Sequence, residues 1–521
     1  MYQAKKTQIA SWLEENSIIK YFSASRPHQL ALLTSVSIVF VITGYIWFIS
    51  FGFWTTWRNT TDYYDQLATA FSQGSLALEK KVDPALLSLT NPYDPRERKE
   101  IDYPLDFSLY MGRYYLYFGP APALLLAILK VFGIGRIGDH LITFIFVSGI
   151  AIFQSLLIIE IWEQFFPRIP IWIISACIVF SGLVSPFAWI LTEARVYEVA
   201  NTSGQFFLIA GLYFNLCALK QKATLPGRFL IGGILWAFAL GSRLTQALPI
   251  GFLTIGITFL TIDTYAKTKS LSKAAYSIVS LGLPLAVGVA AIGWYNWARF
   301  GSIFETGYTY QLTTLDIKGY SNDLFSPLYI LPNLYDYFAA HPKVLNEFPF
   351  LQPIRGRGNL LFPFLRLSKI YYTRATTGIF YSIPFILFAG TPILFIFLSK
   401  KGPKDPPNQD IDTHLLKWLW IGLMGSFLCE LAPFASFFWV ETRYAIDFSP
   451  SLSILSIMGF WLGYGFLSRW PIVRKAYVIG GVGLMIISVL ISSLLVFAIR
   501  SDIYRVWHPV LWNHLSSLFS R

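Results

Sequence analysis

The sequence predicts an all-α polytopic membrane protein with about eleven transmembrane helices, on three observations. Of its 521 residues, 55% are hydrophobic and 17% aromatic, while only 13% are charged, against roughly 25% in an ordinary globular domain. The mean hydropathy is +0.52. Long apolar runs recur between residues 30 and 498, and a membrane span needs roughly 20 apolar residues. This composition excludes a disordered chain, a disulfide scaffold and a collagen-like fibre.

The net charge of +12 comes from 41 Lys and Arg against 29 Asp and Glu. In a polytopic chain, basic residues gather in cytoplasmic loops and orient the helices, so we expect a lipid bilayer as the partner and no nucleic acid. The three cysteines, Cys177, Cys217 and Cys429, each lie inside an apolar run. They therefore predict neither a disulfide framework nor a zinc site.

The first apolar stretch, about 30–54, is too long for a signal-peptide core and is not followed by a small-residue cleavage site, so it reads as a retained span. The 38-residue run 229–266 would be about 57 Å long as one helix, nearly twice the hydrocarbon thickness. It therefore predicts two helices that turn near Ser242 to Thr245. The other predicted spans are 140–162, 170–191, 203–219, 274–297, 378–399, 415–439, 449–467 and 476–498.

The apolar segment 117–134 is ambiguous, and the positions of the basic residues decide its assignment. If it does not cross, every basic cluster falls on the side of the N-terminal segment 1–29. We therefore predict that 117–134 is a re-entrant helix on the outer side, that 1–29 is cytoplasmic, and that the tail 499–521 is external. The basic clusters are those around Arg168, 220–228, 267–273, 400–404 and 469–475.

The predicted organisation places an N-terminal transmembrane module at 30–298, with a first outer loop at 55–116. A large outer loop, 299–377, separates it from the C-terminal helices 378–498, and both outer loops are expected to carry interfacial helices. The cytoplasmic loops are short and contain no phosphate-binding loop or dinucleotide fingerprint. The chemistry is therefore expected at the external face, without direct use of nucleotide.

Two carboxylates open the first outer loop. Asp62 and Asp65 lie one turn apart at the start of a stretch that can form an amphipathic helix on the outer membrane surface. A carboxylate placed there could act as a general base toward an acceptor hydroxyl or amine. The alternative is ordinary capping of the helix by Thr61 or Asp62.

An aromatic patch follows in the same loop, with Asp106 leading into Tyr110, Tyr114 and Tyr117. Aromatic rings at the outer interface often anchor a helix in the membrane. They also offer a sugar ring an apolar face with hydroxyl groups at its edge. Asp106 is therefore a candidate acceptor for sugar hydroxyls, and the tyrosines are candidate substrate contacts.

Further acidic candidates come from other segments. Glu193 and Glu198 lie in a short outer segment with Arg195, and Glu198 could order an acceptor or a metal ion. The alternative is simple solvation of this loop. Glu430 lies late in a predicted span, where an ionisable group is costly and marks a candidate functional site.

Two arginines are predicted on the external side, although most basic residues of the chain are predicted in cytoplasmic loops. Arg243 lies at the turn of the helical hairpin, and Arg443 is followed by Tyr444 at the start of a span. Guanidinium groups pair bidentately with phosphate oxygens, so both are candidate phosphate ligands. The alternative for Arg443 is an ion pair with Asp447 at i,i+4.

This layout resembles the GT-C superfamily of polytopic glycosyltransferases, with most likeness to bacterial members related to protein mannosyltransferases and aminoarabinose transferases. The resemblance rests on the acidic residue just after the first span, the re-entrant helix and the large second outer loop. The stretch 62–74 and the segment DFSLYMGRYYLYFGPAPALLL also look like a bacterial GT-C-like family. Family members usually carry adjacent acids in the first loop, whereas Asp62 and Asp65 are spaced, which leaves Asp62, Asp65 or Asp106 as the base. Asp62 is the first choice, because it is the acid nearest the outer end of the first span, and Asp106 is the second, because it precedes the aromatic patch.

The resemblance implies an inverting transfer of a sugar from a polyprenyl-phosphate donor, at the outer face of a bacterial plasma membrane. The acceptor would be a glycan, a lipid or a protein, and a divalent metal is left open. A transporter or flippase for lipid-linked glycans is the alternative, but it would place charges within the membrane core and often show internal repeats. A scaffold would not explain the acidic first loop.

Overall fold

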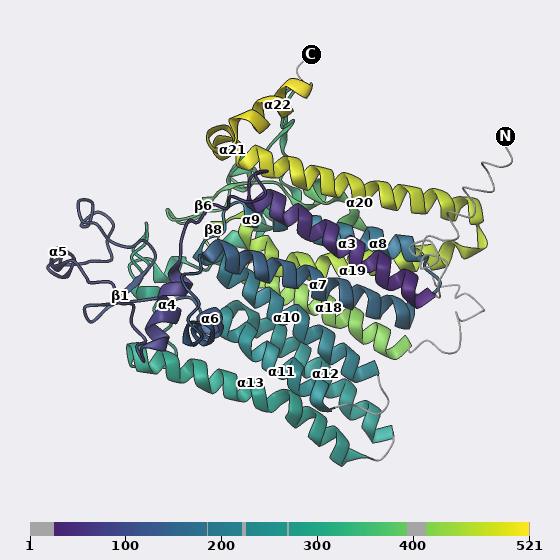
Figure 1. Ribbon diagram of the computed structural model, residues 1–521, viewed down its shortest axis with the longest axis horizontal. Coiled ribbons are helices and arrows are strands. Elements are labelled where there is room, and N and C mark those ends of the chain that lie inside the picture. Colours follow the sequence, from purple (N-terminus) through teal and green to yellow (C-terminus); the bar gives the residue numbers. More distant parts are fainter. Residues whose placement is uncertain (1–25, 185, 221–225, 268–269, 393–412, 520–521) are drawn as a thin grey trace.

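The computed structural model describes residues 26–184, 186–220, 226–267, 270–392 and 413–519. The described chain is a bundle of long helices with short two-stranded pairings at one end (Figure 1). Within these described residues, eight helices are long and apolar enough to cross a membrane, which establishes an all-α polytopic membrane protein. They are α3 (Arg26–Ile49), α7 (Asp139–Phe165), α10 (Val196–Lys220), α12 (Ala247–Lys267), α13 (Leu271–Phe300), α18 (Thr413–Ser436), α19 (Ala445–Phe466) and α20 (Pro471–Ile499).

The predicted break in the run 229–266 is confirmed. Helix α11 (Pro226–Ser242) ends where expected, and a single 3-10 turn, η1 (Leu244–Gln246), leads into α12. Arg243 lies between them with an extended backbone, at φ −156°. The 17 residues of α11 span about 25 Å, which is close to the thickness of the hydrocarbon core.

Two predicted spans differ from the structure. The predicted span 170–191 is not one continuous helix, because α8 (Ile171–Leu183) ends at an extended Val184 and α9 (Phe187–Leu191) begins after Pro186. Pro186 has no backbone N–H to donate to a preceding turn, which favours a break in the helix at this position. The described part of 378–399 forms α16 (Ile379–Ser382) and the 3-10 helix η6 (Pro384–Gly390) rather than one α-helix. Residues 393–399 lie outside the described residues.

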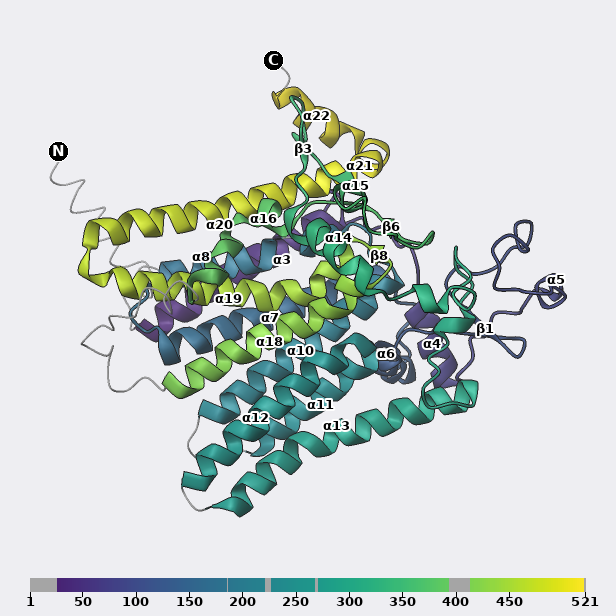
Figure 2. The same cartoon turned by 180° about the vertical axis from the view of Figure 1, so that it is seen from behind.

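The two outer loops gather at one end of the bundle, opposite the end where α3 and α20 begin (Figures 1 and 2). Helix α6, within the predicted re-entrant segment, has 11 residues and is therefore about 16 Å long, too short to cross the hydrocarbon core. It packs against α4 and α11. The other elements of the first loop are α4 (Tyr63–Ser72), α5 (Pro84–Leu87), β1 (Ser108–Tyr110) and β2 (Arg113–Tyr115), with α6 at Ala121–Val131.

The large outer loop is built from short elements that pack over the ends of α18 and α19. Strand β6 (Tyr372–Thr373) pairs in parallel with β8 (Trp439–Val440), which joins this loop to the α18–α19 connection. Strand β3 pairs with β4 and β5 with β7. These elements are η2 (Tyr308–Tyr310), η3 (Ser321–Asp323), η4 (Pro327–Tyr329), α14 (Ile330–Leu334), η5 (Tyr335–Ala339), β3 (Lys343–Val344), β4 (Leu351–Gln352), β5 (Ile354–Arg355), α15 (Arg357–Leu361) and β7 (Ala375–Thr376).

Two short helices after α20, α21 (Ser501–Trp507) and α22 (Pro509–Phe519), lie above the loop end of α20 (Figure 1). The ring of Tyr504 packs edge-on against Phe51, which follows α3. Trp512 is buried beside Phe348 of the large loop. The predicted external tail therefore packs against the end of the first predicted span and against the large outer loop. The remaining 3-10 turns are η7 (Thr442–Tyr444) and η8 (Leu467–Arg469).

Candidate functional site

A cavity of about 270 Å³, here called the aromatic cavity, lies where four segments of the outer end meet. It is bounded by the first outer loop, the start of α10, the large loop and the α18–α19 connection. Because these segments are far apart in sequence, only the fold brings them together. The lining side chains that bear on its chemistry are Asp106, Tyr117, Glu193, Arg195, Tyr197, Glu198, Tyr308, Gln311, Arg374, Trp439, Arg443 and Tyr444.

A second cavity of about 330 Å³, here called the polar cavity, lies beside the first. The part of its wall that does not also line the aromatic cavity comes mainly from the segment that follows α3. The side chains of this segment in the wall are Arg58, Asn59, Thr60, Thr61 and Tyr63. The two cavities share Leu105, Asp106, Arg195 and Tyr197. Two ligands bound in these cavities would therefore meet at Asp106.

Asp106 is 5% exposed and has a left-handed backbone, at φ +67°. Its backbone N–H donates to Leu312 O at 2.8 Å, and Gln311 Nε2 donates to Oδ1 at 3.0 Å. Non-glycine residues with this backbone cost free energy and cluster at functional sites. The surrounding contacts fix the carboxylate in the wall between the two cavities.

Burial raises the pKa of Asp106, because desolvation disfavours the carboxylate. A hydrogen bond with Thr313 and the charges of Arg443, Arg98 and Arg195 oppose that increase. The result is a carboxylate that is harder to ionise than an ordinary aspartate and therefore a stronger base once ionised.

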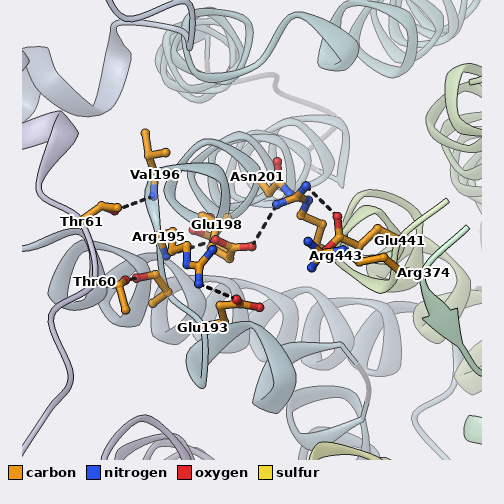
Figure 3. A network of polar contacts seen from close by, with 12 residues as sticks. Thr60, Thr61, Glu193, Arg195, Val196, Glu198, Asn201, Arg374, Glu441 and Arg443 are labelled. Carbon is orange, nitrogen blue, oxygen red and sulfur yellow. Dashed lines mark hydrogen bonds and ion pairs between the residues drawn. The ribbon is translucent and has the colours of Figure 1, made fainter. Parts of the chain in front are cut away.

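Arg443 lies in a cluster of charges on the far wall of the aromatic cavity (Figure 3). Its guanidinium is 2.6 Å from Glu441 and 3.9 Å from Glu198, and it lies 4.4 Å from the centre of the Tyr197 ring. Arg374 also pairs with Glu441, at 2.8 Å. The alternative considered for Arg443, an ion pair with Asp447, is not formed, because Asp447 pairs with Arg243 instead.

Glu193 joins the start of α10 to the C-terminal helices. It pairs with Arg195 at 2.9 Å and with Arg500 after α20. Burial opposes ionisation of Glu193, but the charges of Arg500 and Arg195 outweigh it and lower its pKa. The segment after α3 is tied to the same place (Figure 3), because Thr60 Oγ1 donates to Ala194 O at 2.6 Å.

Arg243 lies behind the aromatic cavity rather than in its lining. It pairs with Asp447 at 3.0 Å and donates to Asn201 Oδ1. Arg243 and Arg443 lie 5.8 and 5.5 Å from the centre of the Tyr444 ring. The fold therefore brings the two predicted arginines to the same aromatic side chain, but only Arg443 faces the cavity.

Glu430 is buried within the bundle and lines neither cavity. It accepts from Gln205 Nε2 at 2.8 Å and from Ser451 Oγ at 3.3 Å. Gln205 also donates to the backbone carbonyl of Asp447. This places Glu430 in the polar network that joins α10, α18 and α19.

Asp62 and Asp65 face the last turn of α6 and the segment that follows it. Asp62 pairs with Arg136, and Asp65 lies 2.6 Å from Lys130 Nζ. Neither carboxylate lines a described cavity. The side chain of Asp62 does not cap α4. That contact comes from Asp139, which accepts from the backbone N–H groups that begin the helix, and no sequence signal singled it out.

Of the three tyrosines predicted in the aromatic patch after Asp106, Tyr117 alone lines either of the two cavities, where it lies near Tyr308. Tyr114 is 1% exposed and pairs across β1–β2 with Leu109. Tyr110 packs against Phe300 and Tyr310. The additional cavity residues Gln311 and Trp439 lie more than 200 residues from Asp106 in the chain, and no local pattern identifies them.

No group of three or more His, Cys, Asp or Glu side chains that could hold a metal ion occurs in the part of the chain that the structure describes. The acids of the aromatic cavity other than Asp106 are paired with arginine, as Glu193 is with Arg195 and Glu198 with Arg443. These residues do not fit a divalent metal, which prefers several free oxygen ligands.

No family model and no curated protein matches the sequence. Among solved structures, the fold is similar to the crystal structure of ArnT from Cupriavidus metallidurans bound to undecaprenyl phosphate, with a TM-score of 0.43 and 9% sequence identity. The match covers 92% of this chain and 79% of that chain. Likeness at this level does not by itself assign an activity to the chain.

Proposed function

We propose that the chain is a membrane glycosyltransferase that moves a sugar from a polyprenyl-phosphate-linked donor to a polar acceptor. The observation that carries this proposal is the position of Asp106 in the wall shared by the aromatic and polar cavities. A transfer between two bound substrates requires such a meeting point, with a base at the acceptor. The GT-C-like layout of the sequence supports the same conclusion.

The donor is assigned to the aromatic cavity. Tyr197 and Tyr308 offer faces on which a sugar ring can pack. Arg195, Arg374 and Arg443 line the same cavity and supply guanidinium groups for the phosphate that leaves with the lipid. The side chains of Arg195 and Arg374 are 41% and 46% exposed, so their free edges are open to a ligand.

The acceptor is assigned to the polar cavity, whose wall carries hydroxyl and amide groups on the segment after α3. In the proposed step, the Asp106 carboxylate takes the proton of an acceptor hydroxyl. The hydroxyl oxygen forms a bond to the anomeric carbon while the bond to the lipid phosphate breaks. Attack from the face opposite the phosphate inverts the anomeric configuration. Asp106 thereby takes precedence over Asp62 as the proposed base.

The proposed location is a bacterial plasma membrane, with the N-terminus cytoplasmic and the C-terminal tail external. In this arrangement the module 30–298 and the later helices hold both cavities at the outer face. The alternative of a flippase is less well supported, because both cavities lie at the outer-loop end of the bundle rather than at its middle.

Mass spectrometry of envelope glycans, lipids and proteins from a strain that lacks the chain tests the proposal. We expect one sugar to disappear from one class of acceptor, and the corresponding polyprenyl-phosphate sugar to accumulate. An unchanged set of sugars on all three acceptor classes would contradict the transferase assignment. Accumulation of a lipid-linked glycan on the inner leaflet alone would favour the flippase.

A further inference from the structure

A small cavity, here called the Asp336 chamber, lies under the large outer loop and is separate from the two proposed substrate cavities. Its volume is about 20 Å³, enough for one water-sized guest. Its lining comes from η5, the strand and helix at 375–383, and the start of α19. The polar residues of the lining are Asp336, Tyr337, Thr376, Thr377, Ser382, Thr442 and Ser449.

Asp336 is 2% exposed and lies in a π-helical turn, a feature that occurs frequently at functional sites. Its Oδ1 accepts from the backbone N–H of Gly358 at 3.3 Å. Its Oδ2 has no hydrogen-bond partner, and no ion pair to Asp336 occurs among the described side chains. A buried carboxylate without a countercharge is costly, and burial accordingly raises the pKa of Asp336 to about 7.

Four hydroxyl groups in the same lining are also unpartnered. The buried hydroxyl oxygens that make no hydrogen bond within the described chain are those of Tyr337, Thr376, Thr377 and Ser449. Buried polar atoms are nearly always satisfied in native proteins. With Asp336 Oδ2, five unsatisfied oxygens around one small cavity therefore indicate a bound guest rather than a packing defect.

We propose that the Asp336 chamber binds a single small monovalent cation of the Na⁺ class. Carboxylate and hydroxyl oxygens are hard ligands suited to such an ion. The chamber has one carboxylate, so a monovalent ion gives a neutral buried site, whereas a divalent ion would leave an uncompensated positive charge. A single water would satisfy the hydroxyls but would leave the carboxylate charge unbalanced.

The chamber adjoins the segment that carries the cavity arginine. Thr442 lines the chamber, whereas Arg443 and Tyr444 in the same turn, η7, line the aromatic cavity. A bound cation would therefore hold this turn in place and position Arg443. The cation site itself does not depend on the proposed glycosyl transfer.

The test uses the full-length protein in detergent at pH 8, where the Asp336 carboxylate is ionised. NaCl replaces N-methyl-D-glucamine chloride at constant ionic strength while thermal unfolding is followed. We expect saturable stabilisation, with a rise in Tm of about 2–4 °C, and binding of about one ²²Na⁺ per chain. A Tm that does not respond to Na⁺, or that responds to Ca²⁺ alone, would overturn the assignment.

Variants locate the ion. Asp336→Asn should abolish the Na⁺ response, whereas Asp102→Asn, which changes an exposed carboxylate of the first loop, should keep it. Because Asp336→Asn could fail to fold, Ser449→Ala provides a second probe, which should fold and bind Na⁺ at least fivefold more weakly. Unchanged ²²Na⁺ binding in Ser449→Ala and in a folded Asp336→Asn would exclude the chamber as the site.

Discussion

The replacement Asp106→Asn separates chemistry from folding at the proposed base. Asparagine keeps the oxygen that accepts from Gln311 Nε2 at 3.0 Å, and it tolerates the left-handed backbone at φ +67° nearly as well as aspartate does. The backbone hydrogen bond to Leu312 is unaffected. We therefore expect a change in unfolding free energy of less than about 1 kcal/mol.

The effect on turnover should be large. Loss of a general base typically lowers the rate by about 10²- to 10⁴-fold, which corresponds to roughly 3–5 kcal/mol of transition-state stabilisation. Asp62→Asn is the matched control, because it makes the same chemical change in the same loop. Its partner Arg136 is 70% exposed, so the lost ion pair costs at most about 1 kcal/mol, and turnover should stay near that of the wild type.

The assay is complementation of the deletion strain with each variant at matched protein level, followed by mass spectrometry of the modified envelope component over time. Asp106→Asn should leave the modification almost absent, and Asp62→Asn should restore it. If Asp106→Asn restored the modification fully and Asp62→Asn did not, Asp62 rather than Asp106 would be the general base. Full restoration by both variants would refute both Asp106 and Asp62 as the base.

Three further predictions concern the charges around the site. Arg443→Lys keeps the positive charge but loses the planar guanidinium that can bind phosphate through two hydrogen bonds, so the affinity for the donor should fall about ten- to hundredfold in a binding titration. An unchanged affinity would contradict the assignment of Arg443 as a phosphate ligand. Arg243→Met leaves the Asp447 carboxylate without its ion-pair partner, and the side chain of Asp447 is only 1% exposed. The unfolding free energy should therefore fall by about 3–5 kcal/mol. An unaltered melting temperature would contradict this prediction. Burial raises the pKa of Asp106, so activity should be lost on acidification at a pH above the ordinary aspartate value of about 4. Arg195→Gln removes one opposing cation and should move that acid limb to still higher pH in a pH–rate profile, whereas an unmoved limb would argue that Asp106 is not the titrating group.

Much of the helical layout was predictable because membrane spans have a strong local signal. The apolar run 229–266 was too long for one span, and its break at Arg243 follows from the thickness of the bilayer. The run 378–399 carried the same compositional signal, yet its described part is a short helix and a 3-10 helix. Hydropathy indicates where a segment is apolar but not its backbone conformation, and here Pro384 begins the 3-10 helix directly after α16 has ended.

The candidate site was predictable only in part. Asp106, Tyr117, Glu193, Glu198 and Arg443 line the aromatic cavity. Asp62 was singled out because of its place after the first span, but its side chain faces Arg136. Several acidic residues in one loop mark that loop as a candidate catalytic site. Which of their side chains faces a cavity depends on segments that are distant in the chain.

The sequence by itself determined that this is a polytopic helical membrane protein, because composition and run length act locally and the bilayer imposes one length scale on every span. It also predicted that the polar chemistry concentrates in the outer loops. Only the tertiary structure decided that Asp106 lies between two cavities and that Arg243 pairs with Asp447. These are contacts between segments separated by about 200 residues, and their formation depends on how helices pack rather than on any local pattern.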